Sequence, residues 1–491
     1  MATFNLVRNS RVFFTTNVDA TTGVIPSSGA TISNTNTFEI QVLDGFSFSQ
    51  ATNADTVTIS EAGAIPVRGQ RSFNTSLANV EFSFSTYIRP KLVSTLVKAE
   101  ESVLWNALLA SDPIGTASDT AFTFTSLTSA TLSNPTTTTN KLSIVGVGMN
   151  TLTVGAYYVV RGVVAVGANQ YNAPVKVLSS TSTLLELEYQ TAPTAAAASA
   201  NWGSTGTVKF SKTAWNEFPA VAADTPASAY SSVVTAHSNK NQLQKFGMYF
   251  LVDNILYAVD NCAMDQATID FGLDGIATIA WTGKGTALRQ LPSTAVVSAA
   301  NPAVFSGAGN ATGTAAAKTT DAQYITNKLS TVTLVSNIGG VSGTTYTLAL
   351  TGGSITIANN ISYVTPANLG TVNTPIGYYT GTRAITGTLN AYLRTGSTNS
   401  AGLLSTMLTN AATTVDPKFK LQVEIGGSSN AVRVEALMDG AMLQIPTIDA
   451  QAVMSTAINF TAQGQESVQT GGTAAYDLEM VNDLRLRYFS S

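Results

Sequence analysis

The chain contains the stretch Ile279-Ala280-Trp281-Thr282-x-x-Gly285 and, 179 residues later, a near copy, Ile458-Asn459-Phe460-Thr461-x-x-Gly464. Just before it, Thr268-Ile269-Asp270 is matched by Thr447-Ile448-Asp449 at the same offset. Alternation of apolar and polar residues is typical of half-buried strands. Because residue types, spacing and order all agree, we predict that one strand-rich unit occurs twice in the chain.

The repeat continues toward the N-terminus at a larger offset. Ser85-Thr86-Tyr87-Ile88-Arg89 corresponds to Asn390-Ala391-Tyr392-Leu393-Arg394, 305 residues later. Leu104 and Leu108 correspond to Leu404 and Leu408, 300 residues later, whereas Ala263-Met264 corresponds to Ala441-Met442 at an offset of only 178. The fall from 300 to 178 means that the first copy carries 122 residues that the second lacks.

Within these additional residues, several short strand patterns are separated by turn signals such as Ser133-Asn134-Pro135. A block of this kind fits a small β-sandwich inserted in a loop. We therefore predict five segments: residues 1–112 and 214–291 as the two parts of copy 1, 113–213 as the inserted β-sandwich, 292–321 as a linker, and 322–491 as copy 2.

Composition agrees with a mainly β protein that associates with other chains. Hydrophobic residues make up 44% of the chain, enough for several cores, but charged residues make up only 11%, against roughly 25% in an average protein. Thr and Val favour strands, and a surface poor in charge is poorly protected against association. The net charge of −4 argues against a basic nucleic-acid-binding surface.

Each copy also carries a helical pattern. In Lys91 to Ser111, apolar residues recur at three and four residues, Pro90 precedes the pattern and Asp112-Pro113 ends it. The second copy repeats the last part of this pattern. We predict one helix flanking each copy, with these residues facing the core: Leu92, Leu96, Leu104, Leu108, Leu404 and Leu408.

The residues that enzymes need are scarce. His237 is the single histidine, Cys262 is the single cysteine, and no Gly-x-Ser-x-Gly motif occurs. Gly283-Lys284-Gly285 lacks the rest of a phosphate-binding loop, and no metal-binding motif is present. The most apolar stretch, Leu152 to Ala168, is interrupted by Arg161 and is too short for a membrane span. The sequence predicts a protein without catalytic activity, cofactor, metal or membrane segment.

Two adjacent segments carry a family resemblance. Val67-Arg68-Gly69-Gln70-Arg71-Ser72-Phe73-Asn74-Thr75-Ser76-Leu77 is followed by Glu81-Phe82-Ser83-Phe84-Ser85-Thr86-Tyr87-Ile88-Arg89-Pro90 and the helical pattern. This order resembles the tail tube proteins of contractile- and long-tailed bacteriophages, most strongly over residues 38–110. Residues 246–285 are similar in the order of elements, and residues 330–464 share the resemblance through the repeat. The inserted block resembles, more loosely, the immunoglobulin-like domains of such proteins.

The resemblance implies two tandem tail-tube β-sandwich or barrel domains, each with one flanking helix, and a self-assembling virion protein. Subunits of this family form rings that stack into a tube through which DNA is ejected. Two domains per chain imply that three chains close a pseudo-sixfold ring. The implied partners are further copies of the chain, the tape measure, baseplate or tip, terminator and possibly sheath proteins, and phage DNA held without sequence-specific contacts. Assembly would take place in the host cytoplasm.

Two sets of candidate residues follow. A stacking loop is expected within Ala51 to Arg71, with a copy near Asn359 to Arg383; its residues would be Arg68, Gln70, Arg71 and Phe73, although a plain hairpin loop explains the pattern too. Acidic residues that outnumber basic ones in both copies could line a lumen and repel phosphate, although ordinary surface acids are the simpler reading. They are Asp253, Asp260, Asp265, Asp270, Glu424, Glu435 and Asp449.

A capsid decoration or host-adhesion protein is the alternative function, because it shares the Thr-rich β composition and immunoglobulin-like modules. The C-terminal run from Leu478 to Phe489 fits either a last strand or an arm that reaches a neighbour.

Overall fold

The computed structural model describes residues 10–26, 36–59, 69–132, 141–163, 171–189, 199–218, 229–235, 242–291, 324–336, 343–413, 418–427, 432–463 and 483–490, except 44, 94–95, 115–118, 254, 274, 447 and 450–454. Strands dominate these residues, and two α-helices accompany them, α1 (Ser102–Leu109) and α4 (Ser400–Thr413). The mainly β fold expected from the sequence is confirmed. The expected linker, 292–321, lies outside the described residues.

Strand pairing follows one order in both halves of the chain. In the first half, antiparallel neighbours run β2–β1–β16–β17–β18–β4–β3, and β19 pairs with β17. In the second half they run β21–β20–β26–β27–β29–β25–β22, and β30 pairs with β27. Each of these strands therefore has a counterpart, and we call the two sets the first unit and the second unit.

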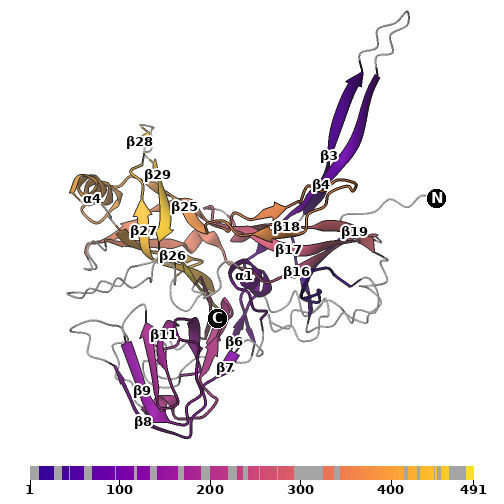
Figure 1. Cartoon of the computed structure of the whole chain (residues 1–491). Helices are drawn as coiled ribbons and strands as arrows, with labels where there is room; N and C mark the ends of the chain where they lie inside the picture. The colour runs from indigo at the N-terminus through magenta and orange to yellow at the C-terminus, as the bar shows by residue number, and fades with distance from the viewer. Residues whose placement is uncertain are drawn as a thin grey trace, which may run out of the picture.

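The strands of the first unit are β1 (Arg11–Thr15), β2 (Thr37–Ile40), β3 (Ser47–Ile59), β4 (Gly69–Tyr87), β16 (Phe246–Val252), β17 (Ile255–Asp270), β18 (Thr278–Gly285) and β19 (Ala287–Leu291). Those of the second unit are β20 (Thr331–Ser336), β21 (Thr345–Leu348), β22 (Leu350–Ala358), β25 (Ala384–Tyr392), β26 (Lys418–Ile425), β27 (Arg433–Leu443), β29 (Ser455–Gln463) and β30 (Arg485–Phe489). Figure 1 shows the second unit beside the first, with the N-terminal hairpin projecting from the first.

Burial alternates along these strands, as the period of two requires. In β26 every second residue is buried, and β18 follows the same pattern around Trp281. One hydrophobic core contains residues of both units, among them Phe84, Trp281 and Phe460. The indole of Trp281 donates a hydrogen bond of 3.0 Å to the hydroxyl of Thr86, which satisfies its polar atom inside the core.

An inserted sheet lies between the two parts of the first unit in the sequence, forms a separate body below the other sheets in Figure 1, and has its own core. Its seven strands pair in the order β7–β13–β10–β11–β12–β9–β8. They are β7 (Asp119–Ala121), β8 (Ser126–Leu132), β9 (Lys141–Val147), β10 (Tyr157–Arg161), β11 (Pro174–Ser180), β12 (Leu184–Tyr189) and β13 (Lys209–Ser211). Its core includes the fully buried Phe122, Trp202 and Phe210. The immunoglobulin-like character and the domain boundaries stay predictions.

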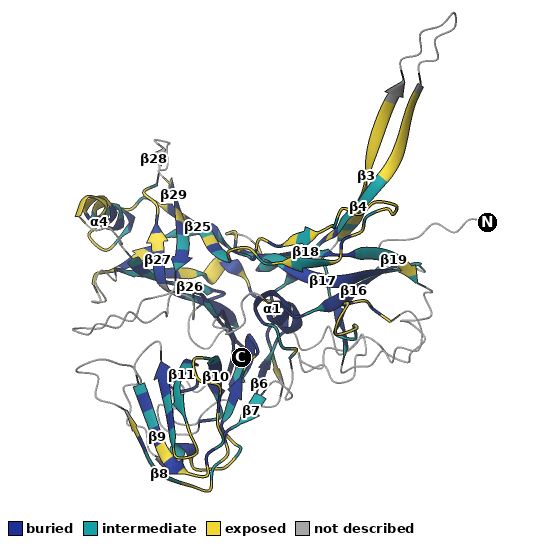
Figure 2. Cartoon of the chain, viewed as in Figure 1, coloured by how far each residue is buried: buried dark blue, intermediate teal, exposed yellow. Residues whose placement is uncertain are grey.

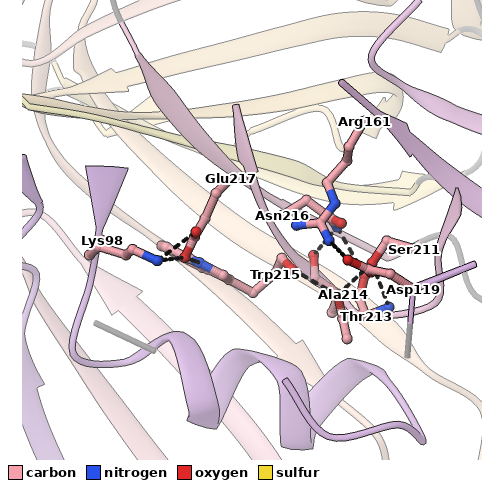
Figure 3. Close-up of polar contacts among 9 residues, drawn as sticks. All are labelled: Lys98, Asp119, Arg161, Ser211, Thr213, Ala214, Trp215, Asn216 and Glu217. Atoms are coloured by element: carbon pink, nitrogen blue, oxygen red, sulfur yellow. Dashed lines mark hydrogen bonds and ion pairs between the residues drawn. The ribbon is translucent and has the colours of Figure 1, made fainter. Parts of the chain in front are cut away.

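One ion pair lies on each side of the junction between the inserted sheet and the strands next to it (Figure 3). Arg161 in β10 pairs with Asp119 in β7. The ammonium group of Lys98 lies 2.6 Å from the carboxylate of Glu217, and Asn216 is fully buried between the two pairs. Buried polar groups that find partners fix one arrangement of the elements that carry them.

The remaining elements connect these sheets. They are β5 (Lys91–Val93), β6 (Leu96–Lys98), β14 (Trp215–Phe218), β15 (Tyr230–Val234), β23 (Ser362–Val364), β24 (Gly377–Tyr379), β28 (Ile448–Asp449) and the 3₁₀ turns η4 (Ser199–Trp202) and η5 (Asn327–Leu329). β30 lies between β15 and β27, so the C-terminal residues from Arg485 form a strand within their own chain. Neither described helix is long and apolar enough to cross a bilayer.

The helix expected over residues 91–111 is wrong in its first half. Leu92 and Leu96 lie in the hairpin β5–β6, where Leu92 is opposite Val97, and the side chain of Leu92 is exposed. The β-branched residues of this stretch favour an extended backbone, and apolar pairs four residues apart fit a tight hairpin as well as a helix. Leu104 and Leu108 are fully buried in α1 as expected. In α4, Leu404 is half-buried, but Leu408 is 53% exposed.

A buried acid begins α1. Glu101 is only 1% exposed, and neither of its carboxyl oxygens has a hydrogen-bond partner among the described residues. Desolvation raises the pKa of this carboxyl to about 8, and the nearby Glu100 raises it further while Arg89 lowers it. The folded protein therefore keeps Glu101 protonated at neutral pH.

We predict that Glu101→Gln removes a pH-dependent loss of stability. The unfolded chain releases this proton near the ordinary pKa of 4.5, so the free energy of unfolding falls as the pH rises from about 4.5 to about 8. The full shift corresponds to roughly 4–5 kcal/mol as an upper bound. Urea unfolding of both proteins between pH 5 and 8.5 measures the difference.

The matched control is Glu100→Gln, which removes the ion pair with Arg89 and leaves Glu101 in place. This control should lose stability over the same pH range as the wild type. An equally steep loss in Glu101→Gln would show that another group is responsible.

Candidate assembly surfaces

The hairpin of β3 and β4 extends beyond the sheet and forms an exposed arm (Figures 1 and 2). Its register runs from Thr52 opposite Leu77 to Ile59 opposite Gly69. Eight residues at about 3.3 Å each give an arm of roughly 25 Å. All side chains from Ala51 to Val57 are exposed, so this arm contacts no core of its own chain.

Two irregularities separate the arm from the base of the hairpin. The register shifts between Gln50 and Thr52 and again between Asn53 and Ala54. Such bulges increase the local twist and redirect a strand. At the second shift, the backbone N–H of Asn373, from the second unit, donates to the oxygen of Thr75 at 3.1 Å, and the N–H of Leu77 donates to the oxygen of Asn373 at 2.8 Å. These hydrogen bonds hold the arm where it leaves the sheet.

One face of the arm combines apolar and charged groups. Asp55 is opposite Phe73 and Val57 is opposite Arg71, and cross-strand partners project to the same side. Phe73 is 53% exposed and Val57 45%. A two-stranded ribbon without a core is only marginally stable in water. The arm therefore has the properties of a segment that another molecule covers.

Of the four expected stacking residues, Arg71 and Phe73 share this face and Gln70 is exposed beside them in β4. Arg68 lies outside the described residues. Asp55 and Val57 lie within the expected loop, Ala51 to Arg71, but the sequence did not single them out, because their place beside Phe73 and Arg71 depends on the register of the hairpin.

The corresponding segment of the second unit, Asn359 to Arg383, does not project. It forms the small hairpin β23–β24, and the hydroxyl of Tyr363 donates to the backbone oxygens of Asn261 at 2.7 Å and Lys284 at 3.0 Å. The hydroxyl of Tyr378 donates to the backbone oxygen of Leu243 at 2.9 Å. This segment docks on the first unit.

The same segment completes a joint between the two units. β22 pairs antiparallel with β17, with Ser354 to Ala358 opposite Asp270 to Gln266. The hydroxyls of Thr268 and Thr356 lie 3.1 Å apart across this ladder. Two sheets that share a ladder cannot slide without breaking several backbone hydrogen bonds, so the joint fixes how the units lie.

Side-chain contacts extend the joint to α1. The side-chain amide of Asn359 donates to the backbone oxygen of Leu108, at the end of α1, at 2.7 Å. The backbone N–H of Ile361 donates to the carboxylate of Asp265 at 2.8 Å, and Lys284 lies 3.0 Å from the same carboxylate. The joint is therefore held by hydrogen bonds and an ion pair of side chains as well as by strand pairing.

Three of the acidic residues expected to line a lumen are paired within the chain. Asp260 is 2% exposed and lies 2.5 Å from Arg289. Glu435 is 4% exposed and lies 2.9 Å from Arg433, and Asp265 belongs to the joint. Buried and paired carboxylates present little charge to a passing polyanion, so these positions do not support a repelling surface.

The other acids occupy different places. Asp270 ends β17 and is exposed, whereas Glu424 in β26 is half-buried and accepts a hydrogen bond of 3.0 Å from Thr331. Asp253 occupies the turn between β16 and β17 with φ of 54°, and Asp449 lies in β28. Their role in a lumen stays a prediction.

Catalytic chemistry finds no support in the described residues. Cys262 is fully buried, and burial raises the pKa of its thiol well above the ordinary value, so it is a poor nucleophile. His237 lies outside the described residues. No group of three or more His, Cys, Asp or Glu side chains that could hold a metal ion occurs in the part of the chain that the structure describes.

Two matching sheet units, an uncovered arm and a joint built from strand pairing are the features of a structural, self-assembling protein. The comparisons agree with this class. The chain is 25% identical over 461 residues to the tail tube protein pb6 of Escherichia phage T5, an alignment that spans 93% of this chain and 72% of that protein. No family model matches the chain.

The expected resemblance to phage tail tube proteins is thereby confirmed. The relationship supports a structural subunit of a phage tail tube, located in the virion tail, and a role that is not enzymatic.

We predict that Phe73→Ala leaves the free energy of unfolding nearly unchanged, within about 0.5 kcal/mol, because Phe73 lies on the exposed arm. Phe84→Ala is the control in the same strand. Phe84 is 3% exposed, so its loss should cost about 3–5 kcal/mol. Urea unfolding measures both, and a cost at Phe73 close to that at Phe84 would show that the arm packs within the chain.

Proposed function

We propose that three chains close into a ring with pseudo-sixfold symmetry, and that these rings stack into the tail tube through which phage DNA is ejected. The observation that carries this proposal is the repeated pairing order, which gives one chain two equivalent sheet units. Homologous subunits assemble most often with closed symmetry, so two units per chain make three chains the natural way to form six. The similarity to a tail tube protein supports the same conclusion.

The proposed domains follow the repeat. Residues 1–112 and 214–291 form the first tube domain, 322–491 the second, 292–321 the linker, and 113–213 an immunoglobulin-like domain on the outside of the ring. The inserted sheet meets the rest of the chain where Val159 of β10 packs in one cluster with Phe218 of β14 and Tyr230 of β15, away from the arm (Figure 1). In this place the inserted sheet would not obstruct the contact between successive rings.

The arm is the proposed contact between successive rings. It extends roughly 25 Å from the sheet and presents Val57, Arg71 and Phe73 together with Asp55 on one face. A face that combines an aromatic ring with both signs of charge fits a specific polar and apolar contact. Gln70 and Arg68 belong to the same proposed contact. At the two ends of the tube, where no further ring follows, the arm would contact other tail proteins instead.

The lumen needs weak contacts with DNA. A chain with a net charge of −4 offers few phosphate contacts, and counterion release is the main source of nonspecific affinity for DNA. The exposed Asp270 and half-buried Glu424 are the acids that best fit the proposed lumen. DNA would pass such a surface without being held.

Electron microscopy of the purified protein tests the ring. We expect hollow rings or tubes of three chains with six inner lobes and three peripheral knobs from residues 113–211. Class averages along the axis and the mass of an isolated ring measure the result. Solid particles, or fibrous trimers without a lumen, would overturn the proposal and favour a decoration or adhesion protein.

We predict that Phe73→Asp blocks stacking but not ring formation, because it places a charge in the proposed contact between rings. Tube length in micrographs and ring mass in solution should separate the two effects, with tubes shortened at least tenfold. Val145→Asp, at an exposed position of the inserted sheet, is the control and should give normal tubes. Full-length tubes with Phe73→Asp would exclude this face from stacking.

A further inference from the structure

The two helices are equivalent in the repeat but differ in their surroundings. All eight residues of α1 are buried, whereas in α4 only Ser400, Leu403, Met407 and Asn410 are. Leu108, which is fully buried, corresponds to Leu408, which is 53% exposed. Part of the cover of α1 comes from the second unit, through Asn359 and Tyr488. The helix of the second unit lacks any such neighbour among the described residues.

The strands of the joint show the same imbalance. β17 and β22 pair with each other, but their counterparts in the opposite units have open edges. The counterpart of β22 is β3, which pairs only with β4 in the described part of the chain. The counterpart of the paired end of β17 is the segment after β27, where Ile445 is 48% exposed. Open edges of this kind invite strand pairing with another chain.

The repeat also sets the register of such a pairing. Trp281 lies opposite Phe84 and Phe460 lies opposite Gly387, so Phe84 corresponds to Gly387. One strand further, Ser47 corresponds to Thr356, because they pair with Ser83 and Thr386.

Thr356 faces Thr268 in the joint, and Thr268 is opposite Ala280 in β18. Ala280 corresponds to Asn459, which accepts the backbone N–H of Gln444, so Gln444 corresponds to Thr268. The strand pairing thus corrects the offset of 179 in this segment, which would assign Thr268 to Thr447.

Backbone directions are compatible with this register. The backbone N–H of Gln444 donates to the oxygen of Asn459 in β29 at 2.9 Å. Since amides alternate along a strand, the N–H of Ile445 points away from β29 and toward the open edge. At the base of β3, Ser47 and Ser49 are exposed, while Phe48 between them stacks on Phe250 inside the unit.

We propose that the joint inside the chain is repeated between chains: the segment after β27 and the exposed face of α4 in one copy bind the base of β3, Ser47 to Gln50, in a second copy. Gln444 then lies opposite Ser47, and the second copy covers Leu408. This inference rests on the proposed ring and names the surfaces that close it. The contact is heterologous, so each chain offers one of each surface and a ring of three leaves none open.

Engineered disulfides test the register directly. Cross-strand partners have Cα atoms about 4.5–5.5 Å apart, which suits a disulfide. We expect Ser47→Cys/Gln444→Cys, after mild oxidation, to give covalent dimers and trimers and nothing larger on a denaturing gel, since both positions are exposed. A mixture of the two single variants should stop at dimers, and each single variant alone should stay monomeric. The native Cys262 is buried and does not interfere.

Two controls accompany this pair. Gln266→Cys/Ala358→Cys, at the joint inside the chain, should form an intramolecular disulfide with no change in mass. Val145→Cys/Gln444→Cys, with one cysteine on the inserted sheet, should form no crosslink. Electron microscopy of the same samples reports whether rings are present.

The outcomes separate the inference from the proposed function. Rings with covalent trimers support both. Rings without crosslinks overturn the proposed joint between chains but are still consistent with the proposed ring. Crosslinked chains of more than three copies without rings support the joint and overturn the ring, and neither rings nor crosslinks overturn both.

A second variant tests the helix face without cysteines. Leu408→Asp should leave the monomer folded, because Leu408 is already half exposed, and should lower the yield of rings at least tenfold. Thr409→Asp, the neighbouring exposed residue on another side of α4, is the control. A circular dichroism spectrum shows whether the variant is folded. A normal yield of rings from folded Leu408→Asp would overturn the proposal that a second copy covers α4.

Discussion

The ladder between β17 and β22 is the contact on which the arrangement of the molecule depends. Five residue pairs join two sheet units that otherwise have separate strand orders, and Asn359, Ile361 and Tyr363 continue the contact along the first unit. Strand pairing is directional and has a fixed register, whereas contact between hydrophobic faces alone allows sliding. Residues far apart in the sequence thereby form one rigid surface, and the arm and α4 take their positions from it.

The C-terminal strand closes the same joint from the other side. β30 lies between the connecting strand β15 and β27 of the second unit, and the hydroxyl of Tyr488 accepts a hydrogen bond of 2.7 Å from the indole of Trp105. Glu435 lies between Arg433 and Arg487 beside Phe489. Breaking a buried charge cluster is costly, so these charges hold β30 in one register. The last residues of the chain thus anchor the second unit on α1.

The sequence supported predictions that depend on local pattern and failed where distant contacts decide. The repeat around Trp281 and Phe460 was recognisable because matched strands must alternate in the same way to share a core. The helix at Leu92 and Leu96 was wrong, because apolar spacing does not distinguish a helix from a short hairpin when β-branched residues are present. Burial of Asp260 beside Arg289 was not predictable, since their pairing depends on the register of β17 and β19.

The arm illustrates the same limit from the functional side. Arg71 and Phe73 could be proposed from the sequence, but Val57 and Asp55 join them only once the strands are paired. The joint between the units left no local signal at all, because β22 and β17 are ordinary strands in isolation. The two units share one pairing order but belong to a single chain, so they are free to differ outside their shared strands. A single repeated subunit must use each surface in the same way at every position, whereas a fused pair can extend the hairpin in one copy and dock its counterpart in the other. The arm of the first unit and the docked segment of the second are the two results of that freedom, and the uneven cover of α1 and α4 follows from it.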